Sequence, residues 1–187
     1  MMAPTHLLVG LAVGSVSLVV APAHTTSAFV AGALGGLAPD LDAVVGTHRR
    51  TLHFPVYGWV VALPAVVLAV LVTASWSVAL ATFCVAAALH PLLDWAEGDA
   101  GWRGWERTSD RAVYCHATSE WLVARRWVRY DGAPEDLLVA ALLAGGLWTV
   151  TTGTVRWVVL ASLVAGAGYA LVRRRVPDAV ERFRART

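Results

Sequence analysis

Six long apolar stretches constrain this chain more than any other feature of its sequence. They cover residues 7–23, 27–38, 57–74, 76–93, 137–151 and 156–172. A membrane-spanning helix needs about 20 mostly apolar residues, and most of these stretches approach that length. Because 57% of the 187 residues are hydrophobic and only 15% are charged, the chain cannot cover a soluble surface in the usual way. We therefore expect an all-α, polytopic membrane bundle of about six transmembrane helices, formed by a single domain over residues 1–187.

The second stretch is the shortest of the six. As a helix, residues 27–38 would be roughly 18 Å long, whereas the hydrocarbon core of a bilayer is about 30 Å thick. It can cross only if most of residues 25–42 are helical. Small residues four positions apart let membrane helices approach closely, and both early stretches carry glycines at this spacing. These glycines are Gly10, Gly14, Gly32 and Gly36, and we expect the two stretches to pack on each other.

The arginines indicate how the bundle is oriented. If all six stretches cross, the amino terminus, residues 39–55, an insertion at 95–136 and a basic tail at 173–187 share one side. That side holds every arginine except Arg156, so the positive-inside rule makes it the cytoplasmic side of a cell membrane. A re-entrant second stretch would strand His6 across the membrane from Asp40. The first stretch also resembles a signal peptide, but no positive residue precedes it, so we expect it to be retained.

The insertion at 95–136 contains five of the nine tryptophans, interleaved with arginines. This composition could bind single-stranded nucleic acid by stacking, but next to a bilayer it is more typical of an interfacial belt. The net charge of +2 is also small for a nucleic-acid-binding protein. We expect membrane lipids as partners, no nucleic acid, and a short cytoplasmic-face hairpin formed by residues 111–116 and 121–130. The tail is suited to anionic lipid headgroups.

Seven side chains that can bind metal lie at or just beyond the ends of the apolar stretches. Ionisable groups are costly in hydrocarbon, so several at one depth indicate a functional site. The expected ligands are His6, Asp40, Asp42, His48, His53, His90 and Asp94. His90 and Asp94 are four residues apart and share one helix face. Asp40 and Asp42 are two apart, so they can converge only if the chain turns after Gly36 and Pro39.

Seven nitrogen and oxygen ligands are too many for one tetrahedral zinc ion, which takes four. Two divalent ions sharing a carboxylate fit better, with zinc as the first expectation and manganese or iron as alternatives. Asp94 and Asp42 are the candidate catalytic residues. Arg49, Arg50 and His116 are candidates for binding the substrate, because arginine suits phosphate and carboxylate groups. The two arginines are equally well explained as positive-inside anchors.

The order of these motifs resembles a known family. Thr5-His6, Pro39-Asp40-Leu41-Asp42, His48-Arg49 with His53, and His90 with Asp94 look like the membrane-bound, predicted metal-dependent hydrolases related to the LexA-regulated inner-membrane hydrolase. Residues 50–57 and 105–138 are similar to its archaeal branch. Bacterial members tend to carry Thr-His-Ser at the second histidine, whereas Leu52 and Phe54 flank His53 here. The resemblance implies a hydrolase with a helical core, distantly similar to zinc-dependent phospholipase C.

Motifs and resemblance together predict a membrane-bound metal-dependent hydrolase. Its substrate would be a small molecule or a lipid-derived compound, with a phosphoester as the first expectation. The alternative is a non-catalytic membrane protein in which the same ligands hold a structural metal and the basic tail recruits a partner or anionic lipid. A structural metal site is closed by protein ligands, whereas a catalytic site leaves one position open.

Overall fold

A computed structural model describes residues 1–98 and 100–184 of the chain. The described part is mostly helical. In chain order the elements are α1 (Ala3–Ser15), α2 (Ser17–Val20), η1 (Pro22–His24), α3 (Thr25–Leu37), η2 (Ala38–Leu41), α4 (Asp42–Val45), α5 (Tyr57–Leu71), α6 (Ser75–Ala96), η3 (Gly104–Glu106), β1 (Arg111–Cys115), β2 (Glu120–Val123), α7 (Pro134–Val150), α8 (Gly153–Val172), η4 (Arg173–Arg175) and α9 (Val176–Arg184), where η denotes a 3-10 turn.

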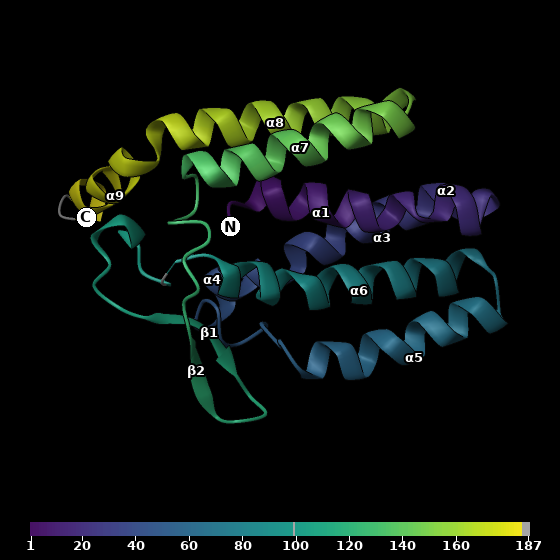
Figure 1. Ribbon diagram of the computed structural model, residues 1–187, viewed down its shortest axis with the longest axis horizontal. Helices are drawn as coiled ribbons and strands as arrows, with labels where there is room; N and C mark the ends of the chain where they lie inside the picture. The colour runs from purple at the N-terminus through teal and green to yellow at the C-terminus, as the bar shows by residue number, and fades with distance from the viewer. Residues whose placement is uncertain (99, 185–187) are drawn as a thin grey trace.

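The long helices lie side by side in one bundle, and the chain reverses direction at each end (Figure 1). α1 packs on α3, α3 on α6 and α6 on α5, while α7 and α8 pack together against α1. The amino terminus, the β1–β2 hairpin, α4 and α9 all lie at the same end of the bundle (Figure 1). The polar motifs are therefore gathered at that end, as their positions in the sequence predict.

Four helical runs in the described residues are long and apolar enough to cross a membrane. They are Ala3–Val20, Pro22–Val45, Ser75–Ala96 and Gly153–Arg182. The second run has 24 residues, so the short apolar stretch at 27–38 lies within a helical segment of sufficient length. α5 and α7 are shorter, with 15 and 17 residues. Helices of membrane length are thus confirmed for four segments, and the crossing of a membrane by all six stretches stays a prediction.

Much of the outer surface of the bundle is apolar. Val70 and Leu71 on α5 are 74% and 76% exposed, and Leu171 on α8 is 84% exposed. Leu8, Phe29 and other apolar side chains form the buried core among α1, α3, α7 and α8. A soluble protein rarely exposes so much contiguous apolar surface, whereas a membrane protein presents it to lipid. The exposed pattern agrees with a membrane protein.

The expected glycine contact joins α1 to α3. A Cβ atom on Gly10 would lie 2.0 Å from the carbonyl oxygen of Gly32, and one on Gly36 would lie 2.3 Å from that of His6. No side chain fits between these backbones, so only glycine permits this approach. The contact brings His6 next to the end of α3, where η2 begins.

A second contact fixes the start of α1. Asp136 on α7 is fully buried and accepts hydrogen bonds from the hydroxyl of Thr5 (2.7 Å), the backbone N–H of Met2 (2.8 Å) and that of Gly132 (2.9 Å). A buried carboxylate is costly unless its oxygens are satisfied, and here three donors satisfy them. Asp136 therefore holds α1 at the depth that places His6 at the polar end.

The predicted hairpin is present, but its second strand is shorter than expected. β1 and β2 are antiparallel, with Tyr114 opposite Trp121 and an irregularity between Arg111 and Tyr114. The pairing ends at Val123 because the following backbone turns to the end of α6. There the N–H groups of residues 125–127 donate to carbonyls of residues 95–97. These bonds satisfy carbonyls at the end of α6 that have no partner within the helix.

Candidate metal centre

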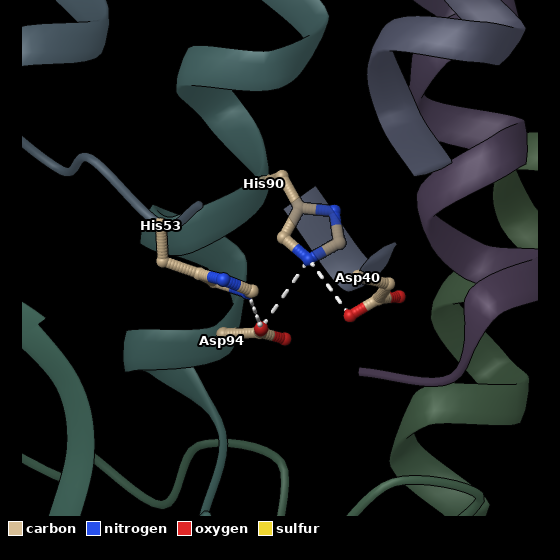
Figure 2. A group of neighbouring side chains, drawn as sticks. All are labelled: Asp40, His53, His90 and Asp94. Atoms are coloured by element: carbon tan, nitrogen blue, oxygen red, sulfur yellow. Dashed lines mark hydrogen bonds and ion pairs between the residues drawn. The ribbon is translucent and has the colours of Figure 1, made fainter. Parts of the chain in front are cut away.

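Four side chains from three segments converge at the polar end of the bundle. Asp40 lies on η2, His53 on the loop before α5, and His90 and Asp94 on α6. Each offers one ligand atom, and these atoms all lie within 4.8 Å of one another. Figure 2 shows one nitrogen of His90 facing both Asp94 and Asp40, with His53 on the other side of Asp94 from Asp40. The described residues thus include one group that could hold a metal ion.

The separations between these atoms suit ligands of one ion. His90 Nε2 lies 3.3 Å from Asp40 Oδ1 and 3.4 Å from Asp94 Oδ2, and His53 Nε2 lies 3.1 Å from Asp94 Oδ2. Two ligands of a tetrahedral ion at bond lengths of about 2.0–2.1 Å are about 3.3 Å apart. These three separations therefore match the spacing of ligands on one small divalent ion.

His90 uses only one of its two ring nitrogens, Nδ1, in a hydrogen bond, and Nε2 has none among the described residues. Nδ1 lies 2.7 Å from the carbonyl oxygen of Gly36, which can only accept, so Nδ1 carries the proton. In the neutral ring, Nε2 is then a lone pair that faces the oxygens of Asp40 and Asp94. His90 is 1% exposed and its Nε2 has no hydrogen-bond partner in the described structure. Several acceptors facing one another require a cation or an additional proton between them.

Asp42 orients the histidines of the preceding loop. Its Oδ2 lies 2.8 Å from His53 Nδ1 and accepts a hydrogen bond from the N–H of Leu52 at 3.2 Å, while Oδ1 lies 3.0 Å from His48 Nδ1. A carboxylate bound to the outer nitrogen of a metal-binding histidine fixes the direction of the ring. Burial disfavours the charged form of His53, but its hydrogen bonds to Asp42 and Asp94 outweigh burial and raise its pKa.

Three of the seven expected ligands, Asp42, His48 and His6, are therefore placed outside the four-residue group. Asp42 is fully buried behind His53, and the His48 side chain, 40% exposed, lies on the outer side of Asp42. The reason is the η2 turn, because Asp40 and Asp42 leave it in different directions. One carboxylate faces His90, and the other faces the loop.

His6 lies against the other side of the group. Its ring stacks on His90 with centroids 3.6 Å apart, and its Nε2 lies 3.0 Å from Asp94 Oδ1. Asp94 thus presents Oδ2 to His53 and His90 and Oδ1 to His6. A carboxylate placed in this way can bridge two ions, one on each oxygen.

Glu97 is a site residue that the sequence analysis missed. It is 1% exposed, and its Oε1 accepts a hydrogen bond from Arg49 NH2 at 2.9 Å. The amino group of Met1 contacts Glu97 and Asp94 as well. Glu97 follows Asp94 by three residues, directly after the end of α6, and this closeness in the sequence was an available signal.

Arg49, one of the expected substrate-binding residues, is buried at the edge of the group. Its Nε lies 3.6 Å from Asp94 Oδ2, and NH1 donates to the carbonyl oxygen of Gly98 at 3.2 Å. Burial disfavours its charge, but Asp94 and Glu97 more than offset this and raise the pKa of Arg49 further. Its backbone has φ of 60°, which is uncommon for a residue other than glycine.

The other two candidates lie on the hairpin side. The Arg50 guanidinium lies 4.5 Å from the ring centroid of Tyr114, and the ring of His116 lies 4.8 Å from that of Phe54. Asp110, near the hairpin, is paired with Arg126 at 2.7 Å. None of these groups is among the four clustered residues, so a role in substrate binding by Arg50 or His116 stays a prediction.

Comparison with known proteins finds no match to this chain among family models, curated proteins or solved structures. The resemblance to the membrane-bound hydrolases therefore stays a prediction that rests on the motifs themselves.

Proposed function

We propose that this protein is a membrane-bound metal-dependent hydrolase that acts on a phosphoester or lipid-derived substrate. The observation that carries the proposal is the convergence of His90, His53, Asp40 and Asp94, each of which offers a ligand atom within 4.8 Å of the others. Histidine and carboxylate ligands favour zinc, with manganese or iron also suited to such a donor set.

The exposure of the ligands supports a site that is open on one side. Asp94, His90 and His53 are each at most 1% exposed, whereas the Asp40 side chain is 26% exposed. Solvent therefore reaches the group at Asp40. A catalytic metal site keeps one position for water or substrate, so this opening favours hydrolysis over a purely structural role.

The residues around the proposed metal would each have a separate role in hydrolysis. A bound divalent cation would activate water and polarise a phosphoryl or carbonyl oxygen. Asp42 holds the rings of His53 and His48 in place, and the Gly36 carbonyl holds His90. Arg49 keeps a positive charge beside Asp94, where a negative charge on the substrate would be favoured.

We also propose two ions and a cytoplasmic location. His6 would be a ligand of the second ion together with Asp94, since its Nε2 lies 3.0 Å from Asp94 Oδ1. Among residues 1–98 and 100–184, every arginine except Arg156 belongs to the segments at the site end of the bundle, which favours the cytoplasmic side by the positive-inside rule.

The alternative, a structural metal with a recruiting tail, makes a different prediction about turnover. We would load detergent-purified protein with zinc, measure bound metal, and follow hydrolysis of bis(p-nitrophenyl) phosphate with and without chelator. We expect metal-dependent turnover that is lost in Asp40→Asn and retained in His24→Ala. His24 is a matched control because its ring bonds to exposed Ser75 at the opposite end of the bundle.

Metal-loaded, folded protein without turnover on phosphoester, ester and amide substrates would favour the structural alternative. Ions fully enclosed by protein ligands, with no position accessible to water, would count against hydrolysis whichever substrates were tried.

A further inference from the structure

A cavity of about 270 Å³ lies beside the metal-binding group. Its wall is built from segments far apart in the sequence: Met1, Ala43, His48, Arg49, Ala100, Gly101, Trp102, Asp131, Tyr169, Arg173 and Val176. Pockets for drug-sized ligands occupy roughly 300–1,000 Å³, so this cavity suits a small group and not a nucleotide.

Two wall residues connect the cavity to the metal-binding group. Arg49 lines the cavity while its Nε lies 3.6 Å from Asp94 Oδ2, and His48 lines it while its Nδ1 lies 3.0 Å from Asp42 Oδ1. A molecule in the cavity would therefore lie one side chain away from the proposed metal.

The charge of the wall favours an anion. Arg49 and Arg173 are the guanidinium groups on it, and Asp131 is its one acidic residue among those described. Asp131 is already neutralised, because Arg173 donates to it from Nε at 2.7 Å and from NH2 at 2.6 Å. Arg49 adds a further positive charge to the wall, and the carboxylates near it, Glu97 and Asp94, do not line the cavity.

Arg49 also has an unused donor. The residue is 4% exposed, yet its Nε has no hydrogen-bond partner, since 3.6 Å to Asp94 is too long for one. A buried donor without an acceptor is costly, and a ligand oxygen would satisfy it. Both guanidinium groups are held in place by carboxylates, so little side-chain entropy would be lost when an anion binds.

We infer that this cavity binds the phosphate group of a small phosphoester, with Arg49 as the principal donor. The inference deepens the proposed function by naming the substrate class, and in that sense it rests on it. Arg49 would hold the phosphate between the cavity and the metal. The phosphoester could be the headgroup of a phospholipid or a water-soluble compound, because both present the same group.

The test is a binding measurement that does not depend on turnover. Equilibrium dialysis would measure inorganic phosphate bound to zinc-loaded, detergent-purified protein and to three variants. Ala43→Trp fills the cavity, Arg49→Lys keeps the charge beside Glu97 but removes Nε, and Val44→Trp is the control. Val44 is the next residue along α4, is 85% exposed and does not line the cavity.

We expect phosphate binding to weaken roughly tenfold or more in Ala43→Trp and Arg49→Lys, since a charge-assisted hydrogen bond is worth about that factor. Val44→Trp should bind as the unaltered protein does, and all variants should keep their zinc. The binding of glycerol 3-phosphate is then compared with that of dihexanoyl phosphatidic acid. Tighter binding of the lipid would identify the ligand as a phospholipid headgroup, and equal binding would identify it as a water-soluble phosphoester.

Phosphate binding that is absent, or that is equal in Ala43→Trp, Arg49→Lys and Val44→Trp, overturns the inference, because the phosphate would then contact only the metal or nothing. Failure of the hydrolase proposal looks different. In that case phosphate binding remains sensitive to Ala43→Trp while metal-dependent turnover is missing.

Discussion

Asp94 is the central residue of the candidate metal centre, since its two oxygens face different partners. Oδ2 lies near His53 and His90, and Oδ1 near His6. We predict that Asp94→Asn, which keeps the shape but removes the charge, sharply lowers the amount of bound zinc. In the unaltered protein, zinc at a hundredfold excess over Kd should add about 2.7 kcal/mol of stability. That zinc-dependent rise in Tm should be nearly absent in Asp94→Asn.

His24→Ala, at the other end of the bundle, provides the control for this experiment. Each variant is compared with itself with and without zinc, so the loss of fold stability caused by removing a buried charge does not enter the comparison. An unchanged zinc content and zinc-dependent Tm in Asp94→Asn would remove this residue from the metal site.

His53 should make the stability of the metal-free protein depend on pH. Its pKa is raised above the ordinary value of 6.5 because its bonds to Asp42 and Asp94 outweigh burial. The stabilisation is therefore fully present below pH 6.5 and is lost as pH rises through the folded-state pKa. With chelator present, we predict that the Tm advantage over His53→Gln is largest below pH 6.5 and shrinks as pH rises above that value.

Zinc should reverse this trend, because a metal binds only the unprotonated ring and its affinity rises with pH. A Tm advantage over His53→Gln that grows with pH in the metal-free protein would show that the ring is neutral there. The negative charges of Asp42 and Asp94 would then have to be balanced by other groups.

At the scale of elements, the packing of α1 on α3 decides whether the site forms. Gly10→Ala would place a methyl group 2.0 Å from the Gly32 carbonyl oxygen, so the helices must separate. We predict a loss of about 1–3 kcal/mol in unfolding free energy, as for other overpacked contacts, together with weaker zinc binding.

Gly145→Ala is the matched control for this change. Gly145 lies within α7 and a Cβ there would meet no atom within 4 Å, so alanine should be neutral or stabilising by up to about 1 kcal/mol. Equal Tm values for Gly10→Ala and Gly145→Ala would mean that the close approach of α1 and α3 is not required.

At the scale of the whole molecule, the two short helices decide the topology. Single cysteines would be introduced in a background without Cys84 and Cys115, and labelled from either side of the membrane. Val44→Cys and Val123→Cys lie at the site end, and Thr73→Cys and Thr152→Cys at the other. If α5 and α7 cross, we expect the first pair to be labelled from the cytoplasm and the second pair from outside. Labelling of Val44→Cys and Thr73→Cys from the same side would exclude a crossing by α5.

The amino-acid sequence by itself determined which segments are apolar helices and which end of the bundle is polar. Burial of apolar surface and the cost of ionisable groups in hydrocarbon act on each segment separately, so both properties can be derived from local composition. The closeness of His90 and Asp94 can also be predicted from the sequence, because helix geometry alone places residues four apart on one face.

Only the tertiary structure decided which polar residues meet. Asp40 and Asp42 are equivalent in the sequence, yet the η2 turn directs Asp40 to His90 and Asp42 to the outer nitrogens of His48 and His53. The partnership of Glu97 with Arg49 also joins residues 48 positions apart. Such contacts depend on how closely two backbones approach and on how a short turn aims its side chains, and neither property is encoded in a local pattern.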